Sequence, residues 1–189
     1  MIKELILKNR SYRRFDPSVR VELETLRELV DLARLSPSAA NAQPLKFLLS
    51  CEAERNALIF KRLAWAGYLR DWPGPAEGER PAAYIVILGD TGLKPEFGVD
   101  PGIVAQSMLL GAVERGLGGC ILSSVRRAEL AQDLGLAGHL QILYVVALGV
   151  PVEQVLLEAM GPEGDIRYGR DEQGVHHVPK RALDDLIVG

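Results

Sequence analysis

A run of uncharged residues between two prolines is the feature that most constrains how this chain can fold. The run reads Ser36-Pro37-Ser38-Ala39-Ala40-Asn41-Ala42-Gln43-Pro44. Pro37 ends any preceding helix at Ser36 or earlier, and Pro44 predicts an extended conformation for Gln43. A solvated connector more often carries Lys, Glu and Asp. The run therefore predicts a stiff loop that offers backbone N–H groups and short amides to a flat, polar ligand.

A second polar cluster, Arg10-Ser11-Tyr12-Arg13-Arg14-Phe15, lies upstream of this loop. Its arginines supply planar forks for phosphate oxygens, and its serine supplies a hydroxyl donor. Taken alone, the cluster also fits a solvated basic turn, and the proline loop also fits a capped helix end. The order of the two segments, with one helix between them, makes a binding site the more specific interpretation.

Composition narrows the class of protein. At 189 residues, with 48% hydrophobic and 25% charged residues, the chain is most simply one globular domain with its own core. A net charge of −3 gives no general attraction to nucleic acid. Cys51 and Cys120 are too few for a disulfide framework. No apolar run has bilayer length and the N-terminus lacks a signal-peptide pattern, so we expect a cytoplasmic protein without a membrane or nucleic-acid partner.

The apolar spacing predicts helices separated by short buried strands. Ser18 is a candidate cap before the second helix, and Asp100-Pro101 is a strong helix start. Helices are predicted over 2–8, 21–35, 52–69, 101–115 and 126–135, strands over 44–51, 82–88 and 141–148, and a Pro/Gly-rich loop over 71–81. Residues 82–88 form a continuous β-branched run, which is typical of a central strand covered on both faces. Periodicity leaves a parallel doubly wound sheet and a mixed sheet both open.

Other catalytic motifs are weak. No G-x-G-x-x-G follows a strand, and neither a phosphate-binding P-loop nor a G-x-S-x-G elbow is present. His176 and His177 are adjacent, so in an extended segment they point to opposite faces, and no third ligand is in sight. We therefore expect no metal site and no hydrolase triad.

The segments R-S-x-R-x-F (from Arg10), S-P-S-x-x-N-x-Q-P (from Ser36) and G-L-G-x-C (from Gly116) resemble the nitroreductase family of flavin enzymes. The resemblance implies an α+β fold, with a mixed, mostly antiparallel central sheet flanked by helices, as a single domain over 1–189. It also implies an intertwined homodimer with FMN at the subunit interface. Residues 152–189 are thin in hydrophobics, and we expect them to lie along the partner subunit.

The same resemblance assigns the cofactor-binding residues. The FMN phosphate and ribityl chain would be held by Arg10, Ser11 and Arg13. The isoalloxazine ring would lie against the loop of the neighbouring subunit and against the segment after the G-L-G-x-C motif. Lys180 and Arg181 would form a second basic clamp, with one side chain inward and the other in water. The full expected set is Arg10, Ser11, Arg13, Pro37, Ser38, Asn41, Gln43, Ile121, Ser123, Ser124, Lys180 and Arg181. Asn9 and Leu45 stand where many members have arginine and tryptophan.

The function implied is that of an FMN-dependent oxidoreductase. NAD(P)H would give a hydride to FMN, and a nitroaromatic, quinone or similar acceptor would then take it. Because the cofactor carries this chemistry, the chain needs no catalytic acid or base. The alternative is a protein that stores, senses or delivers FMN without significant NAD(P)H turnover. No segment of the sequence separates the two.

Overall fold

The longest strand of the computed structural model, which describes residues 1–189, is β5 (Leu140–Pro151), and the main sheet is built around it. The strand order is β1-β5-β3-β2, and β4 also pairs with β5. All four ladders are antiparallel. The remaining strands are β1 (Phe15–Asp16), β2 (Leu45–Ser50), β3 (Ala83–Asp90) and β4 (Gly118–Leu122). The α+β sheet expected from the sequence is confirmed.

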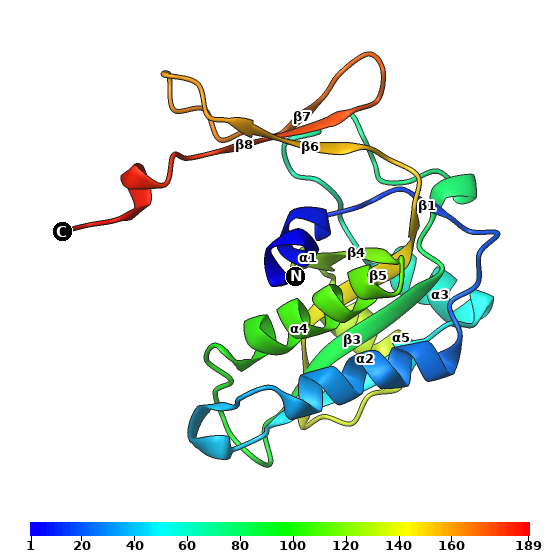
Figure 1. Cartoon of the computed structure of the whole chain (residues 1–189). Coiled ribbons are helices and arrows are strands. Elements are labelled where there is room, and N and C mark those ends of the chain that lie inside the picture. Colours follow the sequence, from blue (N-terminus) through cyan, green and yellow to red (C-terminus); the bar gives the residue numbers. More distant parts are fainter.

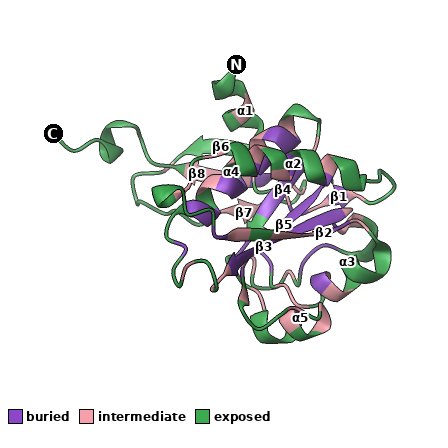
Figure 2. Cartoon of the chain, turned by 90° about the horizontal axis from the view of Figure 1, so that it is seen from below, coloured by how far each residue is buried: buried purple, intermediate pink, exposed green.

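Strand β3 lies between two helical layers (Figure 1). Because side chains alternate along a strand, Ile85 and Ile87 face one layer while Tyr84 and Val86 face the other. The first layer consists of α2 (Leu23–Leu35) and α4 (Asp100–Glu114), and the second of α3 (Ala53–Phe60) and α5 (Arg127–Asp133). Figure 2 shows that the buried residues concentrate on the strands and on the inner faces of these helices. The prediction of a central strand covered on both faces is confirmed.

The helix predicted over 52–69 is too long. Helix α3 ends at Phe60, and the following residues pair with the segment after β4 instead of continuing the helix. The Ala64 N–H donates to the Ser124 carbonyl over 2.9 Å, and Leu63 forms an isolated antiparallel bridge with Val125. These tertiary hydrogen bonds replace the helical ones. An apolar stripe in the sequence cannot reveal such long-range pairing.

Two predicted helix caps are also wrong. Ser18 does not cap α2, whose N-cap is Glu22; its hydroxyl donates to Asp16 Oδ1 over 2.6 Å in a local turn. Helix α4 begins at Asp100 itself, with Val99 at the N-cap. The Asp100 carboxylate is thereby free to bind the proline loop. Helix α1 (Ile2–Lys8) forms as predicted and buries none of its residues.

Residues 152–189 form a small second sheet that the sequence did not predict. Its strands are β6 (Val155–Ala159), β7 (Gly169–Arg170) and β8 (His176–Lys180), with β6 parallel and β7 antiparallel to β8. Residues 181–189 are exposed and lead away from the body of the chain (Figure 1). Whether this segment embraces a partner subunit stays a prediction. No helix in the structure is long and apolar enough to cross a bilayer.

The contact between β4 and its neighbours supplies a test of this packing. A Cβ at Gly119 would lie 2.6 Å from the Ala147 carbonyl oxygen and 2.7 Å from Leu109 Cδ2. Because one of these atoms belongs to the backbone, we expect Gly119→Ala to destabilise the chain by about 1–3 kcal/mol. Urea unfolding measures the change. Gly138→Ala, where no atom lies within 4 Å, is the control, and equal stability of the two variants would contradict the packing described.

Candidate functional site

A pocket of about 290 Å³ collects side chains from both ends of the chain. The N-terminal arm contributes Arg10, Ser11 and Arg13, and β8 contributes Val178 and Lys180. The other lining residues are Asn9, Gln106, Leu109, Gly119, Ile121, Val155 and Tyr168. The pocket therefore contains five of the residues expected to bind a cofactor: Arg10, Ser11, Arg13, Ile121 and Lys180.

The arm reaches the pocket because β4 begins with two glycines. Ser11 forms a parallel bridge with Gly119, and the Tyr12 N–H donates to the Gly119 carbonyl over 3.0 Å. A Cβ on Gly118 would lie 2.5 Å from the Tyr12 ring. Only glycine allows this approach, so the G-L-G-x-C motif positions the arm as well as the strand.

The two arginines of the pocket have unused N–H groups. Arg13 is 9% exposed, and its Nη1 donates to the Ser11 carbonyl over 3.1 Å. Arg10 donates through Nη2 to the Ile6 carbonyl over 2.6 Å. The Nε of each guanidinium is buried without a hydrogen-bond partner, and neither side chain forms an ion pair. Buried unpaired donors are costly, so the pocket suits a ligand with several acceptor oxygens.

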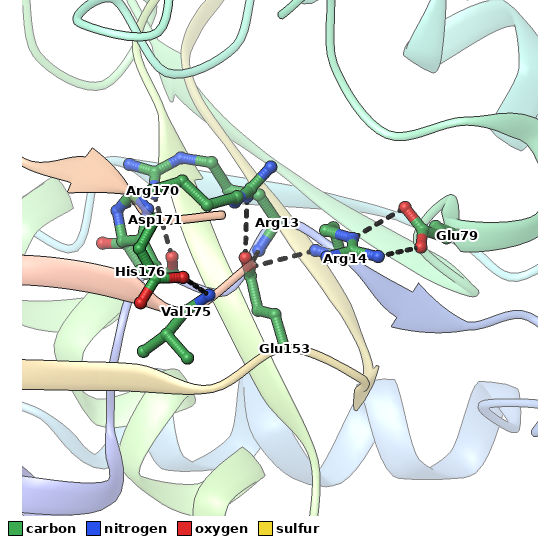
Figure 3. A network of polar contacts seen from close by, with 9 residues as sticks. Arg13, Arg14, Glu79, Glu153, Arg170, Asp171, Val175 and His176 are labelled. Atoms are coloured by element: carbon green, nitrogen blue, oxygen red, sulfur yellow. Dashed lines mark hydrogen bonds and ion pairs between the residues drawn. The ribbon is translucent and has the colours of Figure 1, made fainter. Parts of the chain in front are cut away.

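A buried carboxylate joins the arm to the second sheet (Figure 3). The side chain of Glu153 is 1% exposed. Its Oε1 accepts hydrogen bonds from the backbone N–H groups of Arg13 and Arg14, and its Oε2 accepts one from Arg170 Nη2 over 2.9 Å. Glu153 thus fixes the backbone from which the Arg13 side chain enters the pocket.

Two rings complete the wall behind Arg13. Its guanidinium lies 5.0 Å from the centre of the Tyr168 ring, a cation–π contact. Tyr168 in turn packs against His176, with ring centres 5.1 Å apart. Arg13 Nη1 lies 3.4 Å from His176 Nε2, so this nitrogen is placed to accept a hydrogen bond. Burial, with the nearby cations Arg13 and Arg170 and with His177, lowers the pKa of His176 to about 4.

His177, on the opposite face of β8, has its pKa shifted in the opposite direction. Its two ring nitrogens face Asp171 and Glu158, and hydrogen bonds to these carboxylates raise its pKa. The two histidines do point to opposite faces, as the sequence predicts for an extended segment.

The proline loop lies apart from this pocket and is held by Asp100. Ser38 Oγ donates to Asp100 Oδ2 over 2.5 Å, and the Ala39 N–H donates to Oδ1 over 3.0 Å. Asp100 is 1% exposed. Burial by itself would raise the pKa of Asp100, but these hydrogen bonds and Lys94 lower it. The carboxylate is therefore a charged anchor for the loop.

The extended conformation expected for Gln43 is wrong. Its φ is +48°, and Ala40 and Asn41 both have φ of +52°. Three non-glycine residues in the left-handed region make a strained loop, which is typical of functional segments. Hydrogen bonds from the Gln43 N–H to Ser38 Oγ (2.9 Å) and from Gln43 Nε2 to Asn41 Oδ1 (3.0 Å) hold it. These contacts override the preference of a residue before proline.

The other expected site residues lie outside the first pocket. Pro37, Ser38 and Gln43 line a separate pocket of about 160 Å³ beside α2 and the start of α4. Ser123 lines a third, of about 680 Å³, between α5 and β5. Ser124 uses its carbonyl to accept from Ala64, and Arg181 is exposed. The sequence analysis did not identify Glu153, Tyr168 and His176 as site residues. They contact Arg13 only because the C-terminal segment folds back beside the N-terminal arm, and no local sequence pattern indicates this.

Glu153 offers a first test of the site. Glu153→Gln removes the buried charge that pairs with the partly buried Arg170 guanidinium, so we expect a loss of about 3–5 kcal/mol in the free energy of unfolding. Urea denaturation measures it. The control is Glu163→Gln, at an exposed residue without an ion pair. A Glu153→Gln variant as stable as the control would show that this carboxylate does not hold the arm.

His176 predicts a pH dependence of stability. Because the pKa of His176 is about 4 in the folded chain and its ordinary value is 6.5, the unfolded chain binds the proton more readily. The stability linked to neutral His176 is therefore complete above pH 6.5 and is lost as the pH falls through about 4, by roughly 3 kcal/mol at most. The pH dependence linked to His177 has the opposite sign, because its pKa is raised in the folded chain. The stability that protonated His177 contributes is complete below the unfolded pKa and is lost as the pH rises through the folded pKa.

Denaturant unfolding at several pH values isolates the His176 contribution. We expect His176→Phe to lose less stability than the native chain as the pH falls from 7 to 4. His139→Gln, at an exposed histidine, is the control. If His176→Phe lost as much stability as the native chain between pH 7 and 4, a neutral, buried His176 would be contradicted.

The model of the nitroreductase family matches residues 6–150, whereas no curated protein matches the chain. One similar solved structure is a nitroreductase-like protein from Desulfovibrio desulfuricans in complex with FMN. Its sequence is 21% identical to this chain, and the alignment covers 100% of this chain and 95% of that one with a TM-score of 0.72. A nitroreductase family protein from Streptococcus pneumoniae TIGR4 is 18% identical, with a TM-score of 0.71, over 90% and 100%.

A third solved structure is CLA-ER, an enone reductase of gut-bacterial fatty acid saturation metabolism. It is 18% identical, with a TM-score of 0.67, over 80% of this chain and 89% of its own. At such identities the solved structures show a shared fold. The family model extends from α1 through the arginine arm and the proline loop to the end of β5, and the chain therefore belongs to the nitroreductase family.

Proposed function

We propose that this chain is an FMN-dependent oxidoreductase that takes a hydride from NAD(P)H and passes it to a nitroaromatic, quinone or similar acceptor. The observation that carries the proposal is the pair Arg10 and Arg13, which line one pocket together with Lys180 and whose buried Nε donors have no partner. Family membership and the FMN held by the Desulfovibrio relative support the same proposal.

The donor set fits the phosphate of FMN. A phosphate monoester carries a charge of about −2 near neutral pH and has several acceptor oxygens. Arg10 and Arg13 would hold these oxygens by charge-assisted hydrogen bonds, with the Ser11 hydroxyl as a further donor. Lys180, exposed at the pocket mouth, would add a third positive charge. In this arrangement Tyr168 keeps the Arg13 guanidinium in place from behind.

When bound, FMN supplies hydride transfer, which is why the chain can lack a catalytic carboxylate or histidine. The chain's own task is to bind and orient. Ile121, 38% exposed at the pocket, would lie beside the ring system. Ser123 and Ser124 follow it in the chain and would border the ring through their backbone. Residues 71–81 and 89–99 are the candidates for shaping the acceptor site.

A second copy of the chain would complete the site. Pro37, Ser38 and Gln43 line a different pocket from Arg10, Arg13 and Lys180, and the two pockets share no residue. Both sets can border one cofactor if the loop comes from a partner. Exposed apolar side chains support such a homodimer: Ile2, Ile6 and Leu7 on α1, and Leu183, Leu186, Ile187 and Val188 at the C-terminal end.

Spectroscopy tests the function directly. Protein purified without added cofactor should show flavin absorbance, and anaerobic NADH or NADPH should bleach it. Bleaching followed by reoxidation with a quinone supports the oxidoreductase. Flavin absorbance that neither nicotinamide bleaches would favour the flavin-binding alternative, and a colourless protein that takes up no FMN would contradict both.

A substitution tests the phosphate assignment. Arg13→Ala removes a charged donor from the pocket, so we expect FMN binding to weaken by about 1–3 kcal/mol. The measurement is the quenching of flavin fluorescence on titration of apoprotein into FMN. The control is Arg27→Ala, at an exposed arginine that pairs with Glu24 at 3.4 Å and lines neither pocket. Equal affinity in both variants would show that Arg13 does not hold the phosphate.

A further inference from the structure

A fourth cavity, of about 480 Å³, opens on another part of the molecule, between α3, the segment before α2 and the start of β3. It shares no residue with the pocket of Arg10 and Arg13. Its walls include apolar side chains able to accept a small aliphatic or aromatic group: Val21, Ala57, Phe60 and Pro81. The proposed function assigns no ligand to this space, although the loop 71–81, a candidate border of the acceptor site, supplies Glu77 and Pro81 to its wall.

Two donors in this cavity have no partner. Tyr84 is 1% exposed, and its hydroxyl makes no hydrogen bond. The Nε of Arg80 is also buried and unpartnered. Burial raises the pKa of Tyr84 well above its usual range, although Arg80 nearby lowers it, so the hydroxyl keeps its proton and can donate. Unsatisfied buried donors of this kind favour a ligand with an acceptor group.

The Arg80 guanidinium makes a cation–π contact but no hydrogen bond within the structure. Its Cζ lies 4.3 Å from the centre of the Phe60 ring. The neighbouring carboxylate Glu79 forms its ion pair with Arg14 instead. No hydrogen bond or ion pair of the structure uses Arg80. A planar guanidinium with free N–H groups matches a carboxylate, which it can bind through two parallel hydrogen bonds.

The rim of the cavity is acidic, whereas its interior is lined by the donors of Arg80 and Tyr84. Its exposed charged residues are Arg20, Glu22, Glu52 and Glu77, so carboxylates outnumber cations there. A ligand with several negative charges would be repelled at this entrance. A ligand with one carboxylate and one cationic group would satisfy both the interior donors and the rim.

We propose that this cavity binds a small zwitterion of the α-amino acid class. Its carboxylate lies between Arg80 and the Tyr84 hydroxyl, its ammonium group faces the carboxylates of the rim, and its side chain packs on the apolar walls. Asn56 lines the same cavity but is already committed, because its amide donates to the Ala82 carbonyl over 2.8 Å and accepts from Ser50. It acts as a wall, not as a ligand-binding group.

Calorimetric titration at constant ionic strength tests the proposal with glycine, L-leucine and L-phenylalanine as probes. We expect saturable binding of at least one of them, with one site per chain. Two analogues of leucine dissect the charges: 4-methylpentanoate lacks the ammonium group and isopentylamine lacks the carboxylate. Each should bind about tenfold or more weakly, the factor for one lost hydrogen bond to a charged group. If 4-methylpentanoate bound as tightly as leucine, the zwitterion assignment would be wrong.

Two variants locate the site. Arg80→Gln and Tyr84→Phe should each weaken the binding of the amino acid by about tenfold, whereas Arg70→Gln, at an exposed arginine outside the cavity, should leave it unchanged. Tyr84→Phe removes only an unpartnered hydroxyl, so without ligand it should unfold at the same temperature as the native chain or higher. Flavin absorbance should persist in all three variants. Absence of saturable binding by every probe, or unchanged affinity in both Arg80→Gln and Tyr84→Phe, would overturn the proposal.

Discussion

The contacts of the Glu153 carboxylate tie the N-terminal arm to the C-terminal sheet. One oxygen accepts from two successive backbone N–H groups of the arm, and the other accepts from Arg170 in β7. Arg170 also lies over the Trp72 ring, with 4.7 Å to its centre, so the long loop after α3 joins the same assembly. A buried carboxylate is tolerated only when its lone pairs are satisfied, and here two segments distant in sequence, the N-terminal arm and β7, satisfy them. The pocket exists because these segments meet.

Backbone geometry sets the second constraint. The arm can run beside β4 only because Gly118 and Gly119 leave room for it, and the proline loop keeps three left-handed residues only because Asp100 and Ser38 hold it. Strain in the loop and close approach at β4 are both costs in folding free energy. Both occur at segments that we propose to contact the cofactor. The fold thus supports its strained parts with charged or tightly packed neighbours.

The sequence predicted the layers of this fold better than its connections. The continuous apolar run over residues 82–88 and the periodicity before Pro37 are local signals, so β3 and α2 could be located from them. The end of α3 could not, because Ala64 and Leu63 pair with residues far along the chain. Gln43 was predicted extended from its proline neighbour, and tertiary hydrogen bonds override that preference. In the site, the motif-based residues Arg10, Arg13 and Lys180 share a pocket, but Glu153, Tyr168 and His176 carry no local signal.

Five arginines of this chain fall into two groups that explain where anions can bind. Arg14 pairs with Glu79 and Arg170 with Glu153, so their charges are neutralised inside the structure. Arg10, Arg13 and Arg80 each bury an Nε donor without a partner and form no ion pair. A buried cation that has not been paired by its own fold is one that a ligand can pair at low cost in desolvation, since the water has already been removed. The charges around these arginines distinguish the two cavities. Lys180 lies near Arg10 and Arg13, so that pocket suits a phosphate. The rim near Arg80 is acidic, so that cavity suits a single carboxylate.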